Sequence, residues 1–88
     1  MRKYSNNTKY VIYQNIHTEH YYAVAIAEVI KLDIHHSDMD NFLYAPEDLS
    51  VDCIPVSFNR NNGMIDFENN KIRINVHNLK KQSITISD

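Results

Sequence analysis

Cysteine, glycine and tryptophan are scarce in this chain of 88 residues, which has one cysteine, one glycine and no tryptophan. The one cysteine, Cys53, has no second thiol with which to form an intramolecular disulfide. No apolar stretch follows Met1, Arg2 and Lys3, so the N-terminus is unlike a secretory signal. These absences predict a protein of the reducing cytoplasm.

Long apolar runs and a surplus of positive charge are missing too. Glu28, Lys31 and Asp33 interrupt the most apolar stretch, whereas a membrane-spanning helix needs about 20 apolar residues. The formal net charge is −2, so the chain as a whole has no positive field that would attract phosphate backbones. We therefore expect a soluble protein with no membrane contact, in which any binding of nucleic acid depends on a local basic patch.

Catalytic motifs are also missing, because the sequence has no nucleophile motif, no phosphate loop and no metal-ligand set with a recognised spacing. Histidines and carboxylates are densest at residues 33–40, where His35, His36 and Asp38 would ligate a divalent metal if they converged. A simpler interpretation is that Ser37 caps a helix whose first turn is acidic. We expect no catalytic residue, no metal and no cofactor, and we favour a metal-dependent enzyme least.

The residues that are present predict one folded domain. Hydrophobic residues make up 43% of the chain, which is unlike the composition of a disordered protein. The length is sufficient for a single core. Residues 1–8 are polar and show no periodicity, so we predict a flexible N-terminal tail there. We predict that residues 9–88 form a single globular β-rich domain.

Short segments with alternating apolar and polar residues predict a mainly β (α+β) fold, with a small antiparallel sheet or barrel of five to six strands. These segments are residues 9–14, 54–58, 64–67, 71–77 and 84–86. Asn62 and Gly63 predict a tight turn between the second and the third. Pro55 cannot donate a ladder hydrogen bond and indicates an edge strand or a bulge. Lys80 and Lys81 are predicted to lie in a basic turn.

Residues 18–32 fit a strand as well as a helix. Their β-branched residues and tyrosines favour a strand that pairs with residues 9–14 in a hairpin. Their alanines favour a helix that Thr18 would cap. The apolar face of such a helix would hold Ala23, Ile26, Ala27 and Ile30. Both alternatives stay open.

One short helix is predicted around residues 37–49. Ser37 and the acidic residues after it have the form of a capping box. Pro46, followed by Glu47 and Asp48, is typical of the first turn of a helix.

Tyrosines are the main candidates for binding. The chain has six of them, and four lie in the proposed hairpin. On a sheet face, tyrosines can stack single-stranded bases or anchor a protein partner, although core packing is the alternative for each one. With the basic residues of the C-terminal half, the candidate binding residues are Tyr13, Tyr21, Tyr22, His35, Arg73, Lys80 and Lys81.

Three segments, residues 35–39, 54–58 and 71–76, follow one another in a recognisable order. They are similar to the His-x-Ser-Asp/Glu-Leu/Met element, the Val-x-Val strand and the closing strand of the RNA-binding OB-fold domain named after the largest protein of the bacterial small ribosomal subunit. The chain departs from that family in lacking its glycines near residues 20–22 and near Val51. The resemblance spans most of residues 9–79. It implies an OB-like barrel that contacts RNA through Tyr13, Tyr22, His35 and Arg73.

These observations lead to one preferred function and one alternative. We predict a small non-catalytic binding protein that acts by protein–protein contact on a host or cellular protein. The abundance of asparagine and isoleucine is typical of an AT-rich genome, so a viral or mobile-element inhibitor of a host factor fits this prediction. The alternative is an OB-like module that binds single-stranded RNA. Open strand edges at Pro55 or at residues 84–86 also predict that the chain forms a homo-oligomer.

Overall fold

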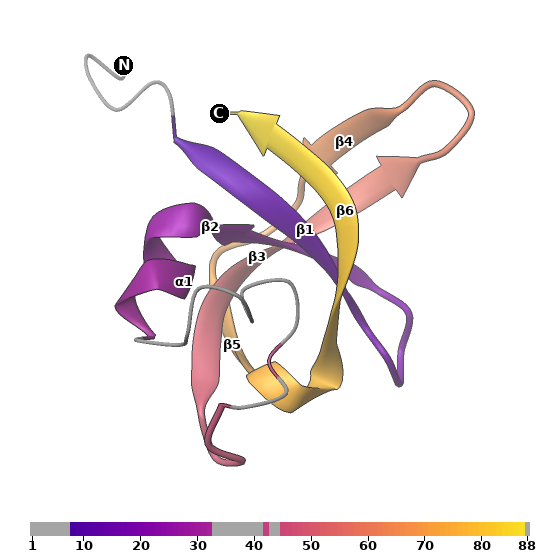
Figure 1. Cartoon of the computed structure of the whole chain (residues 1–88). Helices are drawn as coiled ribbons and strands as arrows, with labels where there is room; N and C mark the ends of the chain where they lie inside the picture. The colour runs from indigo at the N-terminus through magenta and orange to yellow at the C-terminus, as the bar shows by residue number, and fades with distance from the viewer. Residues whose placement is uncertain (1–7, 33–41, 43–44, 88) are drawn as a thin grey trace.

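An antiparallel β-sheet makes up most of the protein (Figure 1). A computed structural model describes residues 8–32, 42 and 45–87. The elements along these residues are β1 (Lys9–Asn15), β2 (Tyr21–Ala25), α1 (Ile26–Lys31), β3 (Ser50–Asn59), β4 (Met64–Phe67), β5 (Ile72–Asn75), the 3-10 turn η2 (Val76–Asn78) and β6 (Leu79–Ser87). The predicted mainly β fold of five to six strands with one short helix is confirmed, but the described helix is α1 at Ile26–Lys31, whereas the prediction placed it around residues 37–49.

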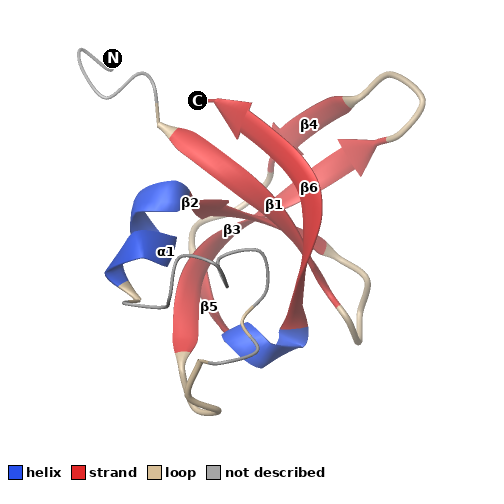
Figure 2. Ribbon diagram, viewed as in Figure 1, coloured by secondary structure: helices blue, strands red, loops and turns tan. Residues whose placement is uncertain are grey.

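The sheet is curled into a half-barrel, which Figure 2 shows from the same side as Figure 1. The strand order is β4-β3-β2-β1-β6, and β5 also pairs with β3. Every one of these pairs is antiparallel. The curl is consistent with the OB-like barrel that we expected.

Strands β4 and β5 lie on the same edge of β3. The N–H of Glu68, just after β4, donates to the carbonyl of Pro55 at 2.9 Å. The N–H of Val76, just after β5, donates to the carbonyl of Leu49 at 2.9 Å. Carbonyls six residues apart on an extended strand point to the same side, so both strands pair with the same edge. They are two halves of one strand that is interrupted at residues 68–71.

Strands β1 and β2 form the predicted hairpin, in which Tyr13 lies opposite Tyr22. The ambiguous segment 18–32 contains both of the expected structures, because the strand ends at Ala25 and the helix begins directly after it. The backbone of Ala25 is extended (φ −61°, ψ 136°) and no side chain caps the helix. Thr18 lies in the turn between β1 and β2, so its predicted role as the N-cap is wrong.

The face that α1 buries also differs from the prediction. Val29 is the buried residue of the helix, whereas Ile30 is 57% exposed. The predicted face assumes a helix that Thr18 caps. The helix begins only at Ile26, so Ala23 lies in β2 and the four predicted residues do not share one helix face.

Pro55 lies in an interior strand, so of the two predicted alternatives, an edge strand or a bulge, the edge strand is wrong. Strand β3 pairs with β2 on one side and with β4 and β5 on the other. The proline nitrogen, which has no hydrogen to donate, points toward the interrupted residues 68–71. The interruption between β4 and β5 therefore accommodates the proline at no cost in ladder hydrogen bonds.

Strand β6 is an edge strand, as residues 84–86 predicted, but it begins at Leu79. Lys80 and Lys81 lie within this strand and pair with β1. The predicted basic turn is therefore wrong, and the chain makes its corner earlier, at η2.

Most of the helix predicted around residues 37–49 lies outside the described residues. Phe42 and residues 45–49 are described, and the N–H of Leu49 donates to the carbonyl of Pro46 at 3.1 Å. The predicted helical start at Pro46 is therefore a turn.

Apolar side chains gather on both faces of the sheet. The cluster on the first face is covered by α1, η2 and the segment before β3, and its buried members are Tyr13, Val24, Val29, Phe42, Ala45, Val51, Cys53, Val76 and Leu79. The cluster on the second face is smaller, with Ile12, Ala23 and Val56 buried beneath Tyr10, Tyr21, Ile65, Ile84 and Ile86. This second face carries the candidate site.

Candidate binding site

A hollow of about 160 Å³ opens on the second face of the sheet, between α1 and the segment that links β4 to β5. Its apolar lining comes from Tyr10, Ala23, Ala25, Ala27 and Ile54. The charged side chains that line it are Glu28, Asp52 and Lys71. An engineered cavity of about 150 Å³ is large enough to hold benzene, so this hollow has room for one aliphatic or aromatic side chain.

Three alanines create the space. Ala23 and Ala25 alternate along β2 and therefore point to the same face. The chain turns into α1 directly after Ala25, which brings Ala27 to the side of the hollow. Larger side chains at these three positions would fill the volume.

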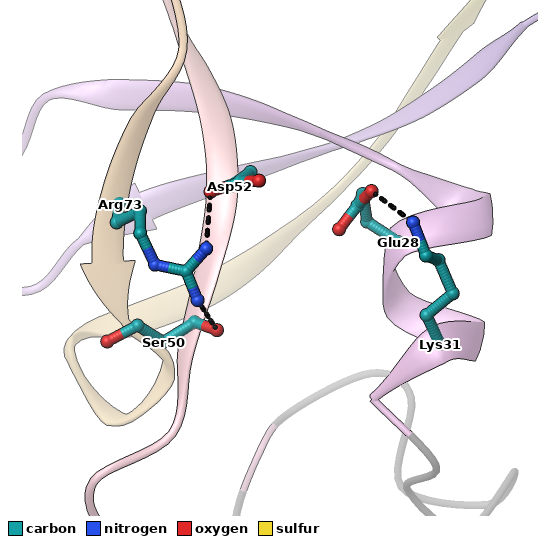
Figure 3. Close-up of polar contacts among 5 residues, drawn as sticks. All are labelled: Glu28, Lys31, Ser50, Asp52 and Arg73. Carbon is teal, nitrogen blue, oxygen red and sulfur yellow. Dashed lines mark hydrogen bonds and ion pairs between the residues drawn. The ribbon is translucent and has the colours of Figure 1, made fainter.

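Each carboxylate of the hollow has a cationic neighbour (Figure 3). Glu28 accepts from the ammonium of Lys31 at 3.1 Å, and Asp52 accepts from the guanidinium of Arg73 at 2.8 Å. The acidic side chains are 23% and 33% exposed, and their cationic partners are 70% and 65% exposed. The carboxylates thus lie between β3 and α1, as Figure 3 shows, while the cations face water. Arg73 also donates to the carbonyl of Ser50 at 3.2 Å.

An aromatic contact closes the sheet next to the hollow. The ring of Tyr10 on β1 meets that of Phe67 on β4 edge to face, with centroids 5.1 Å apart. Phe67 is 42% exposed. Tyr10 belongs to both the contact and the hollow, so the exposed ring of Phe67 lies beside the hollow.

A second aromatic pair lies farther along the same face. Tyr21 meets Phe58 edge to face with centroids 5.5 Å apart, and Arg60 donates to the hydroxyl of Tyr21 at 3.4 Å. This hydrogen bond raises the pKa of the Arg60 guanidinium, which stays charged.

The structure separates the predicted binding residues. Tyr13 is fully buried and stacks on Phe42 with ring centroids 5.2 Å apart, so it is a core residue and its predicted exposed role is wrong. Tyr22 is half-buried against the first-face cluster. Tyr21 is half-buried on the second face. Two tyrosines that are adjacent in sequence therefore point to opposite faces.

The predicted basic residues do not form one patch. Arg73 is exposed beside the hollow, through its contact with Asp52. Lys80 is exposed on β6, and its neighbour Lys81 is half-buried there. His35 lies outside the described residues.

Sequence reasoning missed the small residues that make the hollow. The sequence pattern indicates a helix-forming role for the alanines and a strand at residues 64–67, and neither points to binding. The signal that was available is the spacing Ala23, Ala25, Ala27 in a segment that otherwise carries large apolar residues.

The thiol of Cys53 is buried in the first-face cluster. Burial, and secondarily the charge of Asp52, raises the pKa of the Cys53 thiol to about 12 from its ordinary 9.0. Such a thiol is not a nucleophile at neutral pH. Within residues 8–32, 42 and 45–87, no group of three or more histidine, cysteine or acidic side chains is arranged to hold a metal ion.

A search of the described helices for a membrane span found none with enough length and apolar character.

Comparison with known proteins gave no relative. No family model, no curated protein and no solved structure matches this chain.

Proposed function

We propose that this chain is a small non-catalytic binding protein that contacts another protein through the second face of its sheet. The hollow carries the proposal, because it is a side-chain-sized concavity with an apolar lining beside the exposed ring of Phe67 on β4. Protein interfaces take most of their energy from a few apolar or aromatic anchors that fill such pockets. The occupant is one apolar side chain of the partner. A host factor that a viral or mobile-element protein inhibits is the partner that the composition favours.

The ion pairs around the hollow favour an apolar side chain as its occupant over a cationic one. Both carboxylates that line the hollow already have cationic neighbours, so neither requires a cation from a ligand. An apolar side chain would cover the alanines and leave both ion pairs at the edge of the interface in contact with water. Rim charges of this kind affect association rate and specificity more than affinity.

The test is a substitution that places a larger side chain in the hollow. Ala27 is exposed on α1, and Ala27→Leu keeps a strong helix former while its side chain occupies the space. Ile30→Ala is the matched control, because Ile30 is exposed on the same helix and does not line the hollow.

The partner is first captured from lysate with the wild-type chain, with and without nuclease, and then prepared in pure form. Titration calorimetry should show at least tenfold weaker binding of the partner by Ala27→Leu and unchanged binding by Ile30→Ala. Equal affinity of the wild-type chain and Ala27→Leu would contradict the proposal.

A second candidate function is the binding of single-stranded RNA. The observation that favours it is the exposed guanidinium of Arg60 beside the Tyr21–Phe58 pair, since bases stack on such platforms. The net charge of −2 is against it. Fluorescence titration with a labelled single-stranded RNA would distinguish the two, because RNA binding must weaken steeply with added salt and with Arg60→Ala. Absence of binding at low salt would exclude this candidate.

Self-association through β6 is a separate proposal. This strand ends the sheet, and pairing of residues 84–86 with a second copy would cover its open edge. Light scattering after size exclusion should then give twice the monomer mass, and Thr85→Pro should restore the monomer. A monomer mass for the wild-type chain would exclude it.

A further inference from the structure

Lys71 differs from the other charged residues of the hollow. It lies in the interrupted segment between β4 and β5, it is exposed, and it lines the hollow with Glu28 and Asp52. Within the part of the chain that the structure describes, no carboxylate lies within ion-pair distance of its ammonium.

The charges around the hollow are therefore unbalanced. Glu28 and Asp52 each form an ion pair with a neighbouring cation. Among the described residues, the ammonium of Lys71 has no carboxylate partner. A cationic ligand would have to compete with Lys31 and Arg73 for the two carboxylates. An anionic group at Lys71 would complete a third pair without breaking either of the other two.

We infer that the partner segment has an acidic residue next to the apolar residue that fills the hollow, and that its carboxylate pairs with Lys71. This inference rests on the proposed function, since it specifies which side chains enter the same site. The apolar side chain supplies most of the affinity, and the carboxylate supplies selectivity between acidic and basic segments.

Three blocked tripeptides test the inference on the wild-type chain: N-acetyl-Glu-Leu-Glu-amide, N-acetyl-Gln-Leu-Gln-amide and N-acetyl-Lys-Leu-Lys-amide. The flanking residues are the same on both sides, so the direction of the peptide does not matter. Titrations followed by the amide resonances of Ala25, Asp52 and Ile54 report on the hollow itself. We expect the acidic peptide to bind about two- to fivefold more tightly than the neutral one, and the basic peptide to bind least.

The outcomes separate this inference from the proposed function. Equal shifts with all three peptides, or tightest binding of the basic one, would overturn the acidic selectivity and leave the hollow as an apolar site. Absence of shifts with every peptide would overturn the hollow as a binding site, and the inference with it.

Two variants confirm the residue responsible. Lys71→Gln should abolish the preference for the acidic peptide over the neutral one without changing the affinity for the neutral one. Lys80→Gln is the matched control, because Lys80 is an exposed lysine on β6 that does not line the hollow. It should leave the preference intact. The preference should also shrink at high salt, since exposed ion pairs are screened. A preference that survives in Lys71→Gln would overturn the assignment.

Discussion

Tyr10 and Phe67 touch edge to face, with ring centroids 5.1 Å apart and an interplanar angle of 66°, although β2 and β3 lie between their strands in the sheet. Strands in a flat sheet lie about 4.8 Å apart, so β1 and β4 would be separated by roughly 14 Å. The sheet must therefore curl around the second face. Ala23, which is buried beneath this contact, permits the curl because its side chain is small.

Removal of the Phe67 ring should loosen this curl. We expect Phe67→Ala to lower the free energy of unfolding by about 1–2 kcal/mol, since the ring is partly exposed but makes an aromatic contact. Chemical denaturation measures the change. Met64→Ala, on the same strand and 56% exposed, should change it by less than about 0.5 kcal/mol. Equal effects of the two substitutions would show that the ring contact does not stabilise the fold.

Tyr13 should be far more sensitive than Tyr21. Tyr13 is fully buried and stacks on Phe42, so Tyr13→Ala should cost about 3–5 kcal/mol, the range for buried aromatic residues. Tyr21 is only half-buried, and Tyr21→Ala should cost clearly less. Thermal melts followed by circular dichroism measure which of the two alanine variants is less stable. If Tyr13→Ala does not fold, Tyr13→Leu replaces it, because leucine keeps part of the buried volume. A Tyr13→Ala melt equal to that of the wild-type chain would contradict the core assignment.

Cys53 should make the folded state less stable in alkali. Its pKa is about 12 in the folded protein and about 9 in an exposed thiol. Below pH 9 the thiol is protonated in both states and does not affect their balance. Above pH 9 the unfolded chain loses the proton first, so stability falls by about 1 kcal/mol per pH unit up to about pH 12.

Urea denaturation at pH 7, 9 and 10 of the wild-type chain and of Cys53→Ala measures this contribution. Lysines and tyrosines titrate in the same window, so the difference between the two slopes is the relevant quantity. The variant should lose less stability with rising pH than the wild-type chain. Parallel slopes would show that the thiol is not shielded from water.

Ser83 holds a bend in β6. Its φ of 57° lies in the left-handed region, at the position where the pairing of β1 with β6 shifts register between Val11 and Tyr13. Ser83→Gly should be neutral or stabilise by up to about 1 kcal/mol, because glycine adopts this conformation freely but has more backbone entropy to lose. Ser83→Val should destabilise by at least 1–2 kcal/mol, since a β-branched residue is strained there. Equal melting temperatures of the two variants would contradict this account.

Local patterns predicted the elements that depend on neighbours in sequence. Asn62 and Gly63 predicted the β3–β4 turn, and Gly63 has the positive φ of 71° that such a turn requires. The alternation at residues 71–77 predicted β5. These elements follow from backbone preferences and side-chain periodicity, which act over a few residues.

A local sequence pattern does not predict which face of the sheet each tyrosine occupies. Tyr13 and Tyr21 look alike in the sequence, yet one is buried and the other borders the second face. Burial depends on which strands pair and on what covers each face, and side chains of α1, η2 and the segment before β3 are buried in the first-face cluster.

The sequence by itself indicated a mainly β domain with a first hairpin near the N-terminus, a second hairpin around Gly63 and no recognisable catalytic motif. Only the tertiary structure decided where a binding site can lie. It brings Ala25 of β2, Ile54 of β3 and Lys71 of the β4–β5 link around one hollow. These residues are far apart along the chain, and their meeting depends on strand order and on the curl of the sheet, which long-range packing fixes.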